Sequence, residues 1–132
     1  VLVEKPFTVT SSQAAQLFKV AKEKEILVMP YHNRRYDSDF QAVKKIIESG
    51  KLGNLIEAHF RFDRFKNEIS PTIWKESAIP GSGLLYSLGS HLLDGVILLF
   101  GKPLNWKTSG GYKRANTRIV DYAHVHLNYP ND

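Results

Sequence analysis

The stretch GSGLLYSLGSHLLDGVILLFG, at residues 81–101, limits the possible folds more than any other part of the chain. It is apolar along most of its length, and Gly101 followed by Pro103 provides a helix end. A membrane span needs about 20 apolar residues, and Asp94 with Gly95 interrupts this run well before that length. We therefore expect a buried helix over residues 83–100 of a globular domain.

Three polar residues share one stripe of this expected helix. Ser87, His91 and Asp94 follow one another at i, i+4 and i+7. Gly83 and Gly89 each lower helix propensity by about 1 kcal/mol relative to alanine, which indicates that another group approaches the backbone there. The residues alone leave two interpretations of His91 open: a core histidine that hydrogen-bonds a carbonyl, or a group that performs chemistry.

The N-terminal part predicts a strand, a helix and a second strand. Residues 1–3 have the character of a strand end. Thr10 and Gln13 fit a capping box, and apolar residues then recur at helical spacing through about Lys24. The apolar run at residues 26–29, closed by Pro30, predicts a buried strand.

Further along the chain, another helix is expected after Asp37 or Ser38, and Gly50 or Gly53 would end it. A long loop follows at residues 66–80, and Ile73 and Trp74 are expected to turn inward from it. Loops of this length in compact domains often carry function.

Strands account for most of the remaining residues. Alternating side chains at residues 55–62 and 120–129 predict strands with one covered face. A further strand is expected at residues 104–110, before a turn at Gly110 and Gly111. The fold class is therefore α+β, built on a mixed or largely antiparallel sheet.

Charge and composition exclude several classes of function. The net charge of +5 comes from scattered basic residues, so we expect no nucleic-acid binding. His124 and His126 lie at i, i+2 and could chelate a metal, but no third ligand is apparent and no metal site is expected. The absence of cysteine and of a signal-like N-terminus favours a cytoplasmic protein without membrane attachment.

Lys5 stands immediately before Pro6 at the end of the first expected strand. Lysines in such places are ordinarily solvated loop residues. The proline, however, restricts Lys5 to extended conformations and so directs its amine.

Several motifs occur in an order typical of one enzyme family: EKP at residues 4–6, NRRY at 33–36, GKLG at 50–53 and GSHLLD at 89–94. Together they resemble the glucose-fructose oxidoreductase, inositol dehydrogenase and rhizopine-catabolism family of NAD(P)-dependent oxidoreductases, called Gfo/Idh/MocA. The resemblance covers nearly the whole chain.

That family combines an N-terminal Rossmann domain with a C-terminal domain whose open sheet, covered by helices on one face, often forms the dimer interface. By resemblance, residues 1–30 would be the last helix and strand of the nucleotide-binding domain, and residues 31–132 part of the substrate and dimerisation domain. The chain lacks a Gly-x-Gly-x-x-Gly turn, so we expect a portion of a longer enzyme that binds no cofactor by itself.

The resemblance also implies roles for individual residues. His91 would exchange a proton with the substrate hydroxyl, and Lys5 would contact cofactor and substrate across a possible cis peptide bond. The implied site is catalytic Lys5 and His91, substrate-binding Arg35, Tyr36, Ser87 and Asp94, and cofactor-binding Lys5, Pro6 and Asn33. The family commonly has an aspartate where this chain has Ser87, which would alter or weaken the proton transfer.

The function expected of the complete enzyme is oxidation of a sugar, polyol or related hydroxyl compound, or the reverse reduction, with NAD or NADP. Unpaired sheet edges predict a homodimer or a higher oligomer. The alternative is a non-catalytic binding or oligomerisation module derived from the same fold. Substitution of Ser87 for the usual aspartate favours that alternative, whereas the presence of Lys5 and His91 opposes it.

Overall fold

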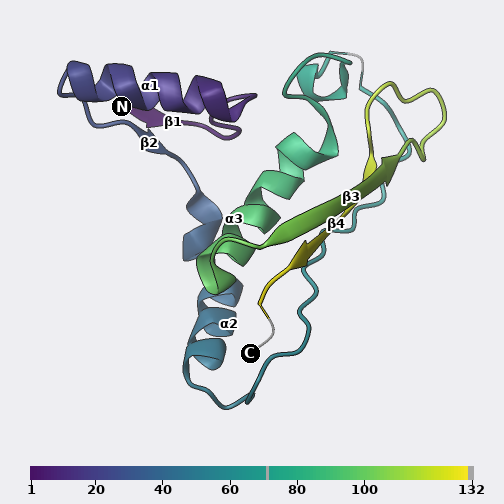
Figure 1. Cartoon of the computed structure of the whole chain (residues 1–132). Coiled ribbons are helices and arrows are strands. Elements are labelled where there is room, and N and C mark those ends of the chain that lie inside the picture. Colours follow the sequence, from purple (N-terminus) through teal and green to yellow (C-terminus); the bar gives the residue numbers. More distant parts are fainter. Residues whose placement is uncertain (71, 131–132) are drawn as a thin grey trace.

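The computed structural model describes residues 1–70 and 72–130 (Figure 1). The elements in chain order are β1 (Leu2–Val3), α1 (Ser11–Glu23), β2 (Met29–Pro30), the 3-10 turn η1 (Asn33–Tyr36), α2 (Ser38–Glu48), the 3-10 turn η2 (Trp74–Glu76), the π-helical turn η3 (Leu85–Gly89), α3 (Ser90–Phe100), β3 (Asn105–Gly111) and β4 (Tyr122–Asn128). The chain combines helices with small sheets, and the α+β fold class is confirmed.

The N-terminal part is a strand, a helix and a parallel strand. The capping box is confirmed, because the Thr10 hydroxyl accepts from the Gln13 backbone and the Gln13 side chain accepts from the Thr10 N–H. The second strand is shorter and later than predicted. The Ile26 N–H still donates to the helix carbonyl of Ala21, so the chain pairs with β1 only at Met29–Pro30.

The predicted long helix is confirmed as two consecutive segments, η3 and α3. The π-helical turn replaces regular α-helix through Ser87, a feature found frequently at functional sites. Helix α2 packs against α3 where a Cβ on Gly95 would come within 3.1 Å of the Phe40 ring. Figure 1 shows α3 beside the β3–β4 hairpin, with the N-terminal strands and α1 at the other end of the molecule.

Strands β3 and β4 form an antiparallel pair in which Thr108 faces Val125. Side chains of β4 alternate between exposed and partly buried, as predicted. The turn predicted at Gly110 and Gly111 is wrong, since both lie within β3. A Cβ on Gly110 would stand 3.0 Å from the Tyr122 carbonyl oxygen, so close pairing of the strands, rather than a turn, accounts for this glycine.

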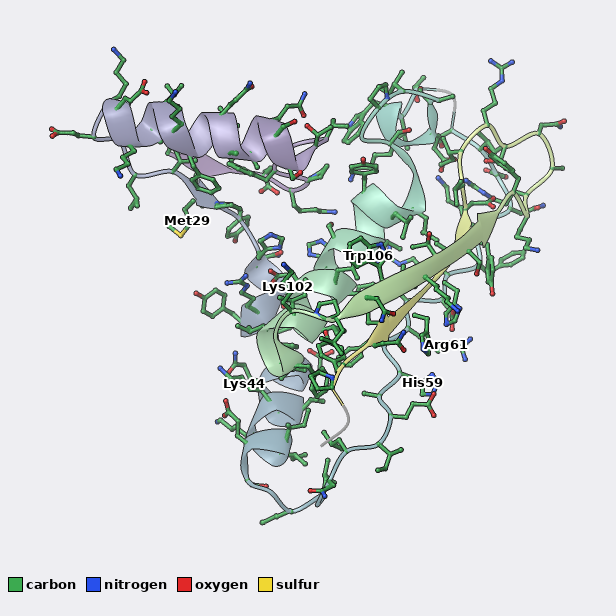
Figure 2. All side chains as sticks on the ribbon, in the orientation of Figure 1. Met29, Lys44, His59, Arg61, Lys102 and Trp106 are labelled. Carbon is green, nitrogen blue, oxygen red and sulfur yellow. The ribbon has the colours of Figure 1, made fainter. Side chains whose placement is uncertain are left out.

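Two expectations for the middle of the chain are wrong. Residues 55–62 form no strand, because within the described part of the chain no backbone hydrogen-bonds to them, and Ile56 is 94% exposed. His59 and Arg61 project from this extended segment in Figure 2. Ile73 and Trp74 are not turned inward, since they are 41% and 48% exposed.

The two sheets are separate and have two strands each. Across residues 1–70 and 72–130, the only buried apolar side chains are Ala21 and Ile119, at 8% and 9% exposure. Large apolar residues such as Trp106, labelled in Figure 2, are more than half exposed. No helix within those ranges has the length and apolar character needed to cross a membrane.

Candidate active site

Lys5 and Ser87 meet although 82 residues separate them in the sequence. The Lys5 Nζ donates a hydrogen bond of 2.5 Å to the Ser87 carbonyl oxygen in the π-helical turn. The Lys5–Pro6 peptide bond is cis, as the resemblance implied. Pro6 itself lines an apolar groove against α1 with Phe7 and Leu17. Ser87 therefore contacts Lys5 through its backbone carbonyl and not through its side chain.

Asp94 joins η1 to α3. Its two carboxylate oxygens accept from Arg35 Nε at 2.7 Å and Nη2 at 2.6 Å, the bidentate geometry of a strong charge-assisted pair. The same carboxylate lies 3.6 Å from His32 Nδ1, too far for a hydrogen bond. Two residues expected to bind substrate, Arg35 and Asp94, are therefore engaged with each other.

His91 has no hydrogen-bond partner on its buried Nδ1 within the described residues, and neither has His32. The pKa of His91 lies below its usual 6.5, first because burial disfavours the imidazolium and then because of the neighbouring Lys5, Arg34 and His32, while Asp94 opposes the shift. The ring is neutral at neutral pH. The carbonyl partner expected of a core histidine is absent from the described ranges, and a neutral imidazole that can accept a proton remains.

Lys5 is also surrounded by positive charge. Burial lowers its pKa most, the charges of Lys75 and Arg34 lower it further, and Glu4 opposes them. Lys75 comes from η2 in the long loop, and sequence reasoning did not include it in the site. The sequence did predict that this loop carries function. That the charge of Lys75 acts on Lys5, however, depends on the tertiary structure.

The loop is held against the N-terminal segment by packing at Val9. A Cβ on Gly81 would be 3.0 Å from the Val9 side chain, and the Tyr86 hydroxyl donates to the Val9 carbonyl at 3.1 Å. Residues that follow Lys5 and residues that follow Lys75 are thereby brought together.

Two expected site residues are not drawn into this cluster. Tyr36 is 82% exposed, and Asn33 is exposed as well. His124 and His126 lie on the exposed side of β4, where His126 Nε2 hydrogen-bonds Asn128 Oδ1 at 2.8 Å. The part of the chain that the structure describes contains no group of three or more histidine, aspartate or glutamate residues suited to a metal ion.

A second charged cluster, called here the Arg114 cluster, consists of Lys66, Glu76, Arg114 and Asp121. Arg114 Nη2 is 2.8 Å from Glu76 Oε2, and Arg114 Nε is 2.9 Å from Asp121 Oδ2. Lys66 Nζ adds a contact of 2.6 Å to Glu76. The hydrogen bonds from Arg114 and then Lys66 lower the pKa of Glu76. The Arg114 cluster fixes Glu76, the residue after Lys75, to the turn between β3 and β4.

Comparison with known proteins identifies the class of fold. A family model described as GFO/IDH/MocA C-terminal domain matches residues 40–132. The solved structure of the oxidoreductase yvaA from Bacillus subtilis superimposes with a TM-score of 0.89 at 36% identity, covering 98% of this chain and 36% of that one.

Curated relatives agree with that comparison. The uncharacterized oxidoreductase C115.03 of Schizosaccharomyces pombe is 40% identical over 132 residues, covering 98% of this chain and 36% of the relative. The scyllo-inositol 2-dehydrogenase (NADP(+)) IolW of Bacillus subtilis is 37% identical over 129 residues, with coverage of 98% and 36%. The chain belongs to the GFO/IDH/MocA family, and it spans about 36% of the length of these relatives.

Proposed function

We propose that this chain forms the substrate-binding and proton-transfer part of an NAD(P)-dependent oxidoreductase that acts on a CH–OH group of a sugar, polyol or related compound. The observation that carries the proposal is His91, a neutral imidazole near Lys5 whose buried Nδ1 has no partner among residues 1–70 and 72–130. Such a group can take a proton from a hydroxyl as that carbon is oxidised, and return it in the reverse direction.

Each residue of the site has a role in this mechanism. His91 accepts the hydroxyl proton on an imidazole nitrogen. The Lys5 ammonium, held on the Ser87 carbonyl, donates a hydrogen bond to the substrate oxygen and stabilises the charge that develops there. Asp94 fixes Arg35 and keeps a negative charge near His91. Arg35, Tyr36, Ser87 and Asp94 would line the path of the substrate.

The residues present fit one end of a nicotinamide cofactor. When bound, this group would accept or deliver the hydride. Lys5, Pro6 and Asn33 would hold it, since the Lys5 amine offers a polar contact and the apolar groove lined by Pro6 offers an apolar one. The name of IolW includes NADP(+), which supports this class of cofactor. We propose further that residues 1–30 belong to a nucleotide-binding domain, and that the chain alone holds no cofactor.

The decisive experiment is substitution of His91 by asparagine in the complete enzyme. Turnover should fall at least about 100-fold, because general acid–base catalysis contributes that much or more. The matched control is His124→Asn, since His124 is exposed on β4. Unchanged turnover in His91→Asn would remove His91 from the mechanism.

Titration of NAD(H) and NADP(H) into the 132-residue chain tests the cofactor proposal. The fluorescence of Trp74 and Trp106 should not respond in a saturable way. Saturable binding would contradict the proposal that the cofactor depends on a further domain.

A non-catalytic binding or oligomerisation module is the second candidate, and Ser87 favours it because a serine cannot supply negative charge beside His91. Assembly as a homodimer is proposed for either function. The exposed faces of β3 and β4, with Trp106 64% and Tyr122 50% exposed, support it. Light scattering of wild type and Trp106→Glu would measure the oligomeric state.

A further inference from the structure

We infer that His32 is a further positioning residue of the site, and that its Nδ1 donates a hydrogen bond to Asp94 when substrate is bound. The inference rests on the proposed function, because in that mechanism Asp94 holds Arg35 and keeps a negative charge near His91. His32 immediately precedes the NRRY motif at residues 33–36 and lies outside it.

The turn η1 directs His32 and Arg35 toward the same carboxylate. The backbone of His32 is held on both sides, because its N–H donates to the Pro30 carbonyl at 3.2 Å and its carbonyl accepts from the Arg35 N–H at 3.2 Å. Residues three apart in a 3-10 turn project from the same side. The side chains of His32 and Arg35 therefore reach α3 together.

Asp94 lies close to both side chains. Its Oδ2 accepts from Arg35 Nε at 2.7 Å and is 3.6 Å from His32 Nδ1. The side chains of His32 and Asp94 are only 23% and 15% exposed, so little water competes for this contact. On α3, His91 precedes Asp94 by three residues, and one helix face presents both. A donor that fixes the Asp94 carboxylate therefore also fixes the charge near His91.

The contact is favourable only if Nδ1 of His32 carries a proton. This nitrogen is buried and has no hydrogen-bond partner within residues 1–70 and 72–130. A neutral imidazole has one protonated nitrogen and one lone pair, and a lone pair that faced the Asp94 carboxylate would be repelled. Hydrogen bonds in substrate-free sites are often long and shorten when substrate binds, so a separation of 3.6 Å is compatible with this role.

Other histidines of the chain are arranged differently. His59 is 72% exposed and pairs with a neighbouring glutamate, and His126 hydrogen-bonds an asparagine two residues later. In the described part of the chain, Nδ1 of His32 and Nδ1 of His91 are the only buried side-chain nitrogen or oxygen atoms without a partner. His32 also lies near enough to His91 to contribute to the lowered pKa of that residue. The two rings therefore belong to one site.

The first test is the tautomer of His32 in the complete enzyme, measured by ¹⁵N NMR of the imidazole ring. At about pH 8, above the usual histidine pKa of about 6.5, the proton should be on Nδ1. The signals of His32 are identified by their loss in His32→Asn. A proton on Nε2 would overturn the inference. An unchanged tautomer in Asp94→Leu, which has no acceptor at that position, would overturn it as well.

The second test is the kinetics of two His32 variants of the complete enzyme, with the scyllo-inositol and NADP(+) that appear in the name of IolW. His32→Phe keeps a ring but removes the donor, and kcat/KM should fall about tenfold. His32→Asn keeps an N–H donor near the position of Nδ1 and should recover most of that loss. The matched control is His59→Phe, since His59 is exposed. Unchanged kcat/KM in His32→Phe would contradict a positioning role.

A double-mutant cycle shows whether His32 acts through Asp94. If it does, His32→Phe combined with Asp94→Asn should lose about tenfold in kcat/KM, as Asp94→Asn does by itself. A loss of about 100-fold would mean that the two residues act independently, and the inference would be overturned.

These results are separable from the proposed function. A proton on Nε2 of His32, together with lost turnover in His91→Asn, would overturn the inference and leave the proposed function standing. The NMR measurement needs no turnover, so it decides the inference even if scyllo-inositol is not oxidised or His32→Phe does not fold.

Discussion

The two charged clusters of this protein use similar residues in opposite ways. In the Arg114 cluster, two carboxylates face two cations at 2.6 to 2.9 Å, and Glu76 and Asp121 are nearly inaccessible at 9% side-chain exposure. Around Lys5 and His91, positive groups outnumber carboxylates. Two buried imidazole nitrogens also lack partners in the described residues.

The difference separates a structural cluster from the candidate active site. Arg114 and its partners satisfy one another, so their charges are stabilised in the fold. The partly buried, positive surroundings of Lys5 and His91 disfavour the charged form of each side chain and lower both pKa values. Perturbed groups of the second kind are typical of functional sites.

The largest effect on stability is expected when the ion pairs of the Arg114 cluster are broken. Arg114→Met leaves Asp121 and Glu76 without the hydrogen bonds of their main cation, and the free energy of unfolding should fall by about 2–3 kcal/mol. Urea unfolding measures the loss. Arg118→Met is the control, since Arg118 is exposed in the same turn. Equal losses in the two variants would show that the Arg114 cluster contributes no special stability.

A smaller effect is expected when the carboxylate that pairs with Arg35 is removed. Asp94→Asn keeps the shape but releases Arg35 from its two strong hydrogen bonds, and kcat/KM should fall about tenfold. Asp63→Asn removes one partner of an exposed pair with Arg61, both side chains being 74% exposed, and should have little effect. Activity retained in Asp94→Asn would contradict a positioning role for Asp94.

The two clusters should also lose stability in different pH ranges. The unfolded chain binds a proton at His91 as pH falls below 6.5 while the fold resists it, so this residue lowers stability from that point downward. Replacing His91 with glutamine should remove that part of the loss.

Glu76 has a lowered pKa in the fold, so its contribution is present above its usual 4.5 and disappears as pH falls below it. The contribution of Asp121 to stability disappears in the same way as pH falls below its usual pKa of 3.8. Burial raises the pKa of Asp121, but the hydrogen bonds from Lys113 and Arg114 outweigh that effect and lower it. Glu76→Gln should therefore flatten the acid side of the stability curve. Thermal unfolding between pH 3 and 7 checks both ranges. If His91→Gln altered stability only below pH 4.5, or Glu76→Gln only above it, the assignment of these residues to the two pH ranges would be contradicted.

The smallest effect is expected from adding charge to the site. Ser87→Asp places a carboxylate near Lys5 and should raise the pKa of His91, seen by NMR titration of its ring protons. Activity at pH 7 should change by no more than about threefold, because the ring remains largely neutral. Ser109→Asp, on exposed β3, is the control. An unchanged His91 pKa would mean that position 87 does not act on the imidazole.

The elements predicted from sequence were those whose stabilising contacts are local. Helix α1 with its capping box, the helical run that ends at Phe100 and the alternation along β4 all depend on residues a few positions apart. The family resemblance was also present in short motifs, and the comparisons confirmed it.

Tertiary structure decided the features that depend on contacts between distant segments. The alternating run at residues 55–62 is not a strand because a strand requires hydrogen bonds from another segment, and the described residues supply none. Lys75 was missed for the same reason, since its relation to Lys5 depends on packing between segments about 70 residues apart. Sequence alone specified the helices and named the candidate site residues, whereas only long-range packing determined which charges in the described residues are paired and which are not.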